Sequence, residues 1–148
     1  MAFETAAGAT LAASAALPAT YDAAGYAALT FTDVGEVENL GAFGRNYNLV
    51  SFLPLAERGA SKQKGSFNNG QFNPRLALDA DDTGQGILET ALDSDNAVAL
   101  RVTLSSGRIY YMSVLVMQWQ PTIGTVDDIV MVESNFEVTR DDVVRVDP

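Results

Sequence analysis

Acidic side chains are the residues of this sequence whose spacing could do chemistry, because histidine and cysteine are both absent. Their absence removes imidazole bases, thiol nucleophiles and the usual zinc ligands. Asp79, Asp81 and Asp82 offer carboxylate oxygens, which are the ligands that Ca²⁺ prefers. Their spacing does not meet the D-x-[DN]-x-[DN]-G pattern of a calcium-binding loop. We therefore expect neither a metal site nor a cofactor site.

Two further acidic pairs, Asp127-Asp128 and Asp141-Asp142, could serve as the paired carboxylates of a glycosidase. The sequence shows no aromatic-rich sugar platform and no other catalytic signature beside them. Aspartates in such pairs are common in turns, where their side chains accept hydrogen bonds from nearby backbone groups. We interpret both pairs as turn residues and predict that the protein has no catalytic residues and is not an enzyme.

The charges are segregated along the chain, whose formal net charge is −10. Residues 45–75 hold five basic residues and one acid, a balance of 5 − 1 = +4, so the remainder carries −14. This basic segment is either a solvated surface on an acidic protein or a patch that meets an acidic patch of another copy. Nucleic-acid binding is disfavoured, because nine scattered cations on an acidic chain displace few counterions from phosphate. The five basic residues are Arg45, Arg58, Lys62, Lys64 and Arg75.

The first 28 residues are rich in alanine and differ in composition from the rest of the chain. No Lys or Arg precedes Arg45, and Glu4 stands where a secretory signal needs a cation, so the segment does not resemble such a signal. Its apolar run over 6–17 is too short to span a bilayer, and we expect no membrane partner. We predict an N-terminal arm over 1–28, either disordered or ordered along a neighbouring subunit, before a single β domain over 29–148.

A long hairpin is predicted in the first half of the β domain, with strands over 46–53 and 71–79. Between them, residues 54–70 include three glycines and few apolar side chains, which predicts a mobile polar loop. A loop of about 15 residues is uncommon inside a compact domain and is usually functional or disordered. It contains Arg58, Lys62 and Lys64, the densest cations of the chain.

One segment has the pattern of a helix. Asp82 can cap its first turn, and Gln85 stands three residues later, as in a capping box. A helix of about three turns is marginal alone in water, so its apolar stripe must pack on a sheet. That stripe consists of Ile87, Leu88, Ala91 and Leu92.

The C-terminal half has the alternation of a β-meander, with strands over 98–104, 108–120, 126–139 and 143–146. The strand over 108–120 is apolar on both sides, so we expect it to be covered on both faces. In the strand over 126–139, Glu133, Asn135 and Glu137 alternate with core residues and face away from the core. The fold class is therefore mostly β: a β-sandwich or small barrel with one packed α-helix and a long hairpin with an extended polar loop. The core-facing residues of 126–139 are Val130, Val132, Phe136 and Val138.

The order of these elements resembles that of the tail tube (major tail) proteins of long-tailed bacteriophages, which are related to the tube fold of contractile tails and of type VI secretion. The resemblance covers residues 29–146. It rests on a hairpin carrying GASKQKGSF, a strand and helix in LALDADDTGQGILETAL, and closing strands in TVDDIVMVESNFEVTRDDVVRV.

The resemblance implies a structural virion protein that forms hexameric rings stacked into a tail tube, assembled in the host cytoplasm. DNA would pass through the lumen without specific binding, and the tape measure protein and the tail terminator would be further partners. Six copies carry 6 × −10 = −60 formal charges, so contacts that neutralise charge between rings would matter. Arg58, Lys62 and Lys64 are the candidates for this inter-ring contact. An acidic lumen would repel phosphate, and Glu133, Asn135 and Glu137 are its candidate lining.

Two other classes of function fit the same residues. One is another tail component, such as a tail terminator or connector, which would stop at a single ring. The other is a monomeric β-sandwich module for binding or adhesion. Assembly state separates the three, because a tube subunit forms rings or filaments, a terminator forms one ring and a binding module stays monomeric.

Overall fold

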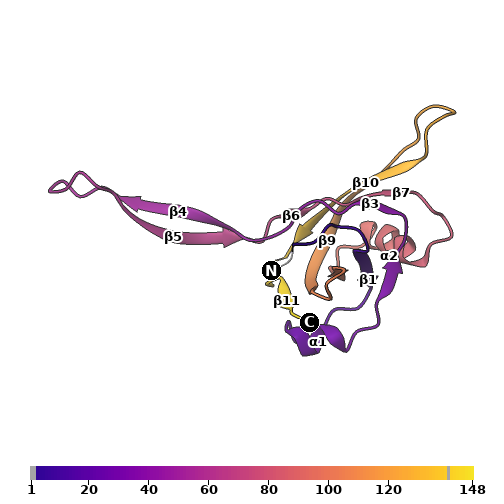
Figure 1. Cartoon of the computed structure of the whole chain (residues 1–148), viewed down its shortest axis with the longest axis horizontal. Helices are drawn as coiled ribbons and strands as arrows, with labels where there is room; N and C mark the ends of the chain where they lie inside the picture. The colour runs from indigo at the N-terminus through magenta and orange to yellow at the C-terminus, as the bar shows by residue number, and fades with distance from the viewer. Residues whose placement is uncertain (1–2, 140) are drawn as a thin grey trace.

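The computed structural model describes residues 3–139 and 141–148, which form a β-rich body with two protrusions (Figure 1). The body contains a large antiparallel sheet and two helices, and a separate two-stranded sheet forms one protrusion. In chain order the elements are β1 (Thr10–Ser14), α1 (Ala23–Ala27), β2 (Thr32–Val34), β3 (Val37–Asn39), β4 (Asn46–Phe52), β5 (Ser61–Asn68), β6 (Gln71–Phe72), β7 (Arg75–Ala77), α2 (Thr83–Leu92), β8 (Val98–Thr103), β9 (Ile109–Thr122), β10 (Met131–Val138) and β11 (Val144–Val146).

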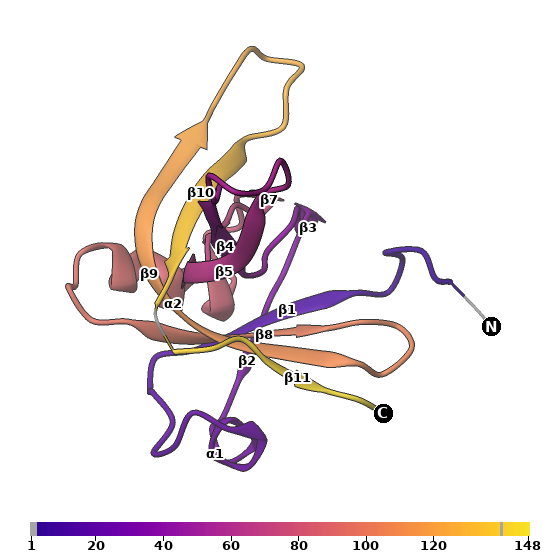
Figure 2. The ribbon, with the colours of Figure 1, turned by 90° about the vertical axis from the view of Figure 1, so that its left-hand side faces the viewer.

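Strand β9 organises the large sheet, because its two halves belong to different parts of it. Residues 109–114 pair with β8, and residues 109–111 pair with β11 on the other edge. Residues 114–122 instead pair with β10, which continues to β6, β7 and β3. Figure 2 shows β9 curving from one half into the other, so the two halves face each other across a core. The mostly β, sandwich-like prediction is confirmed, and the described strands form no closed barrel.

The main core lies between the two halves of the sheet and helix α2. Side chains from both halves meet there, and α2 contacts β1, β2 and β9. On β10 the predicted alternation is confirmed for Val132, Phe136 and Val138, whereas Val130 precedes the strand and is only half-buried. The largest fully buried side chains of this core are Phe72, Phe136, Leu11, Leu76, Leu88, Leu100 and Met112.

Helix α2 begins where the sequence predicts, with Asp82 as its N-cap accepting a hydrogen bond from the backbone N–H of Gln85. The side chain of Gln85 does not close a capping box. It is buried, donates to the carbonyls of Gly35 and Ala77, and accepts from the backbone N–H of Asp79. Gln85 therefore ties the helix to the β2–β3 turn and to the end of β7.

The predicted N-terminal arm is corrected by the structure, because residues on both sides of position 28 belong to the same sheet. Thr10–Ser14 form β1, which pairs with β2 on one edge and with β8 on the other. Leu11, Ala12 and Ala13 are buried there. Small side chains permit this close packing. The prediction of an arm considered only the small area that each of these residues can bury. Residues 1–2 of the predicted arm lie outside the described residues.

Helix α1 was not predicted, and it covers the opposite face of the sheet from the main core. Asp22 caps it by accepting a hydrogen bond from the Gly25 N–H at 2.7 Å. The ring of Tyr26 stacks on that of Tyr111 with centroids 5.2 Å apart. The first half of β9 is thus covered on both faces as expected, whereas Met117 in the second half is 58% exposed.

The long hairpin exists, but its strands differ from the predicted ones. β4 pairs with β5, in a register that joins Phe52 to Ser61, and not with residues 71–79. The connecting loop therefore covers only 53–60, and much of the predicted polar loop is a strand. β5 lacks an apolar alternation because neither face of the hairpin is buried within the subunit.

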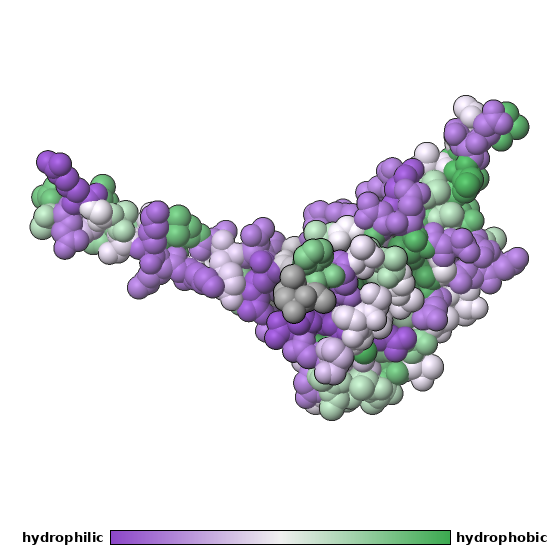
Figure 3. All heavy atoms as spheres, in the orientation of Figure 1, coloured by the Kyte–Doolittle hydropathy of each residue, from purple (hydrophilic) through white to green (hydrophobic). Residues whose placement is uncertain are grey.

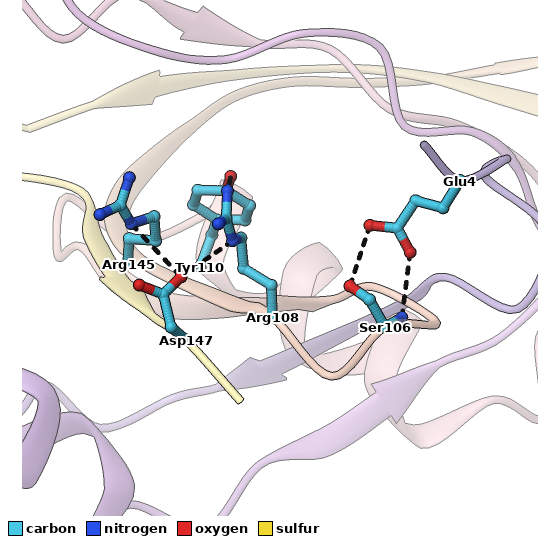
Figure 4. Close-up of polar contacts among 6 residues, drawn as sticks. All are labelled: Glu4, Ser106, Arg108, Tyr110, Arg145 and Asp147. Carbon is cyan, nitrogen blue, oxygen red and sulfur yellow. Dashed lines mark hydrogen bonds and ion pairs between the residues drawn. The ribbon is translucent and has the colours of Figure 1, made fainter. Parts of the chain in front are cut away.

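Both ends of the described chain are fastened to the β8–β9 turn region (Figure 4). The Glu4 carboxylate accepts hydrogen bonds from the hydroxyls of Ser105 and Ser106 and from the Ser106 N–H. Asp147 forms ion pairs with Arg108 at 3.0 Å and with Arg145 at 3.6 Å. No helix in the described ranges is long and apolar enough to cross a membrane.

Candidate functional site

The β4–β5 hairpin projects from the body (Figure 1), and exposed apolar side chains occur along it (Figure 3). An isolated two-stranded hairpin is marginally stable in water, and exposed apolar patches mark interaction surfaces. The hairpin is therefore a candidate contact surface for another chain. Its exposed apolar residues are Tyr47, Leu49, Val50, Phe52, Leu53, Leu55 and Phe67.

Aromatic and cationic side chains stiffen the root of the hairpin. The rings of Tyr47 and Phe67 lie 5.5 Å apart, and the Arg45 guanidinium lies 4.3 Å from the centre of the Phe67 ring. Arg45 also forms an ion pair with Asp142 of the body. Its pKa is raised, chiefly by the hydrogen bond it donates to the Tyr47 hydroxyl. The root thus holds the hairpin in a defined direction, while its tip makes no comparable contact among the described residues.

The three predicted assembly cations all lie on this hairpin. Lys62 and Lys64 are on β5, opposite Ser51 and Leu49 of β4, and so project from the same face. Arg58 is in the exposed loop that joins the strands. None of the three forms an ion pair with another described residue, although the Lys64 ammonium lies 4.6 Å from the centre of the Tyr47 ring.

A second protrusion joins β9 to β10 and ends in an apolar tip. Ile123, Val126 and Ile129 are exposed there, with Val126 at 98% of its full exposure. Asp128 closes the turn by accepting hydrogen bonds from the N–H and hydroxyl of Thr125, which lower the pKa of its carboxyl. This tip is acidic, whereas the hairpin over 46–68 holds three cations and one acid.

The predicted lumenal residues lie on the outer face of the same sheet, opposite the core. Glu133 pairs with Arg75 of β7 and Gln120 of β9, whereas Asn135 pairs with Gln118. Glu133 and Asn135 both line a shallow hollow of about 420 Å³. The structure therefore brings these two residues together.

Glu137 lies further along the same face and accepts a hydrogen bond from the Gln71 side chain at 2.6 Å. Gln71, Arg75 and Gln118 complete this polar surface. Of these three, only Arg75 was noted from the sequence, as a member of the basic segment. Their alternation with Phe72, Leu76 and Trp119 is the signal that could have found them.

One edge of the sheet is open beside this polar surface. Residues 115–122 of β9 pair with β10, and no described strand pairs with their other edge. At the opposite side, β3 pairs only with β7 among the described strands. Edges such as these present backbone N–H and C=O groups to a further strand.

Solved structures of other proteins share this fold. One match is a chain in the cryo-EM structure of the anti-feeding prophage baseplate, symmetrised six-fold, with a TM-score of 0.70 and 8% identity over 99% of this chain and 98% of that chain. Another belongs to the tail of an empty gene transfer agent particle, refined helically with C6 symmetry, with a TM-score of 0.65 and 11% identity over 93% and 95% of the two chains. The chain shares its fold with subunits of six-fold particles.

A third match belongs to the virion of the native gene transfer agent particle, with a TM-score of 0.63 and 11% identity over 78% of this chain and 88% of that one. No protein-family model matches the chain, and no curated protein matches its sequence. Identities of 8–11% show a common fold, so the function must be argued from the surfaces of this chain.

The described residues contain no cluster of three or more acidic side chains placed to hold a metal ion. Asp82 of the predicted acidic cluster is used for capping, where it accepts from the Gly35 and Gln85 N–H groups. Asp79 accepts from the Asp81 N–H in a local turn. The surfaces that distinguish this molecule are thus the hairpin, the β9–β10 tip, the polar sheet face and the open edges.

Proposed function

We propose that this chain is a structural subunit of the tail of a phage-like virion, which assembles with copies of itself into hexameric rings stacked as a tail tube. The observation that carries the proposal is the β4–β5 hairpin, whose apolar side chains are exposed in the single chain. The recurrence of the fold in two assemblies with six-fold symmetry supports it.

Ring formation would use the open edges of the sheet. The free edge of β9 over 115–122 and the outer edge of β3 bound the strands β9, β10, β6, β7 and β3. Pairing one edge with the other edge of the next subunit satisfies backbone groups that water must otherwise solvate. Such a contact joins two different surfaces, and six of them close into a ring.

The channel wall would be the polar face with Glu133, Asn135 and Glu137. The other face of these ring-forming strands is buried in the core of the subunit through Val132 and Phe136. The polar face is therefore the solvent face of the ring, and we assign it to the lumen. Its two glutamates repel phosphate, which lets DNA pass without specific binding.

Stacking between rings would use the hairpin with Arg58, Lys62 and Lys64. A single exposed ion pair contributes only about 0–1 kcal/mol, but a ring repeats each contact around its circumference. The apolar hairpin residues add buried area to these ion pairs. We place the tube in the virion tail, assembled in the host cytoplasm, with the tape measure protein inside it and the tail terminator at its end.

Sedimentation velocity of the purified chain over a range of concentrations tests this proposal. We expect a monomer to convert into a species of six subunits and then into larger tubes as concentration rises. A chain that remains monomeric at millimolar concentration in both low and high salt contradicts the proposal and favours a monomeric binding module.

A second candidate function is a connector or another tail component that forms one ring. The full-length match to a baseplate chain supports it. This candidate predicts a six-subunit species that does not grow further as concentration rises, which the same sedimentation series distinguishes from a tube.

A further inference from the structure

A hollow lies beside helix α2. It encloses about 600 Å³ and is lined by one side of α2 together with the segments that precede β8 and follow β1. This volume falls in the range of about 300–1,000 Å³ that accommodates a compact ligand or several side chains. We call it the α2 groove; its apolar lining comes from Ala15, Ala80, Ile87, Ala91, Ala97 and Val98.

The lining of the α2 groove includes two carboxylates, Asp81 and Asp82, and no Lys or Arg. Residues 76–100 contain six carboxylates and no Lys or Arg. None of the six forms an ion pair with another described residue. An apolar hollow with an uncompensated acidic rim suits an apolar segment that carries cations. The six are Asp79, Asp81, Asp82, Glu89, Asp93 and Asp95.

The hairpin tip has this complementary chemistry. Leu53 and Leu55 are exposed at the tip, with Leu55 fully so, and Arg58, Lys62 and Lys64 lie close by in the sequence. Residues 46–68 hold three cations and one acid, a balance of 3 − 1 = +2. The apolar tip can enter the groove while its cations meet the acidic rim.

The hairpin of the same molecule cannot supply this occupant. Figure 1 shows the hairpin pointing away from the body, with α2 on the other side of the body. The remaining apolar protrusion, the β9–β10 tip, carries Asp127 and Asp128 and no cation over residues 123–130. Like charges oppose its entry into the acidic groove, which leaves the hairpin of a second copy.

We propose that the α2 groove receives the β4–β5 hairpin tip of a second copy of this chain. Leu53 and Leu55 fill the groove, and Lys62 and Lys64 meet carboxylates that include Asp81 and Asp95. This inference rests on the proposed function and names the receiving surface for its inter-ring contact. Because hairpin and groove are different surfaces, the contact is head to tail and can propagate from ring to ring.

Charge exchange on the full chain tests the inference. Asp81 and Asp95 are exposed, and their side chains accept no hydrogen bond from another described residue. We expect Lys62→Glu with Lys64→Glu, and separately Asp81→Lys with Asp95→Lys, to raise the concentration needed for tubes by about tenfold or more. All four changes in one chain should restore tubes at close to the original concentration. Failure of that rescue, with all variants folded by circular dichroism, overturns the inference.

Filling the groove gives a second, uncharged test. A Cβ at Gly86 would meet no heavy atom within 4 Å, so Gly86→Trp can occupy the groove without displacing the core. We expect it, like Leu55→Ser, to block tube growth while six-subunit rings still form. Val126→Ser on the other protrusion is the matched control and should leave stacking by the hairpin unchanged.

The outcomes separate the inference from the proposed function. Normal tubes from Gly86→Trp overturn the groove as the receiving surface, even if the unmodified chain forms tubes. Loss of stacking in Val126→Ser together with normal stacking in Leu55→Ser assigns the contact to the β9–β10 tip and also overturns the inference. An unmodified chain that never forms rings or tubes overturns the proposed function itself.

Discussion

Two glycines of helix α2 have opposite surroundings, and they show how closely the helix packs on the sheet. A Cβ at Gly84 would lie 2.2 Å from the carbonyl oxygen of Asp33, whereas a Cβ at Gly86 would meet no heavy atom within 4 Å. Only the first glycine is required by packing. The helix can approach the end of β2 because residue 84 has no side chain.

We expect Gly84→Ala to destabilise the subunit by about 1–3 kcal/mol, because the added methyl group forces backbone atoms apart. Gly86→Ala should instead stabilise it by about 0.5–1 kcal/mol, since alanine is the better residue inside a helix. Urea unfolding of both variants, at concentrations below assembly, measures the difference in free energy. Equal effects from the two changes would show that α2 does not lie this close to β2.

The Glu4 carboxyl provides a residue-level test of how the N-terminal segment is held. Hydrogen bonds from Ser106 and Ser105 lower its pKa below the ordinary value of 4.5. A lowered pKa in the folded state means that the stabilisation is present above about pH 4.5 and is lost as pH falls through the lowered value. NMR titration of Glu4 should show this lowered pKa, and Ser106→Ala should move it back toward 4.5. An unchanged titration in that variant would contradict the contact.

Individual residues were predictable where their partners are local. The cap at Asp82 could be read from the sequence because its hydrogen-bond partner, Gln85, is three residues away. The buried role of Gln85 could not, since two of its partners are the carbonyls of Gly35 and Ala77, which only the fold brings to it. Residues assigned to the channel and to ring contacts remain predictions for the same reason, because the partners that we propose for them belong to other copies.

At the scale of elements, strands were predictable where one face is buried. β10 shows the predicted alternation, but it begins at Met131, five residues after the predicted start at 126. β8 ends within one residue of its predicted bounds, although its first three residues are all buried. β5 was interpreted as a loop because its residues are almost all exposed in the subunit, so no burial pattern marks it. β1 was missed because three of its four buried residues are Ala or Ser, whose small side chains also suit an unstructured arm.

The hairpin should be separable from the body, because neither core cluster includes a residue of 46–68. Its main tie to the body is the exposed ion pair between Arg45 and Asp142. We expect replacement of residues 49–64 by a short Gly-Ser turn to change the free energy of unfolding by no more than about 1 kcal/mol. Tubes should be abolished by the same change.

Urea unfolding and sedimentation of the shortened chain measure these two effects on one sample. The multiple change Leu49→Ser, Val50→Ser and Phe52→Ser is the matched control, since it keeps the hairpin length and removes part of its apolar surface. Tubes from the shortened chain would show that the hairpin is not an assembly element.

At the scale of the whole molecule, fold class could be predicted from alternation and composition, but sheet order could not. The bend of β9 divides one strand between two halves of the sheet, and no local sequence signal marks where its partner changes from β8 to β10. The open edge along residues 115–122 follows from that division. We propose that this edge is completed by a neighbouring subunit.

Electron microscopy of the purified, concentrated chain tests the central claim most directly, because image averages report ring number, stacking and lumen together. Our account predicts hollow tubes of stacked six-subunit rings. In their reconstruction Glu133, Asn135 and Glu137 face the lumen, and the β4–β5 hairpin contacts the neighbouring ring. Single particles of one subunit, or tubes with this polar face on the outer surface and the hairpin free in solvent, would contradict it.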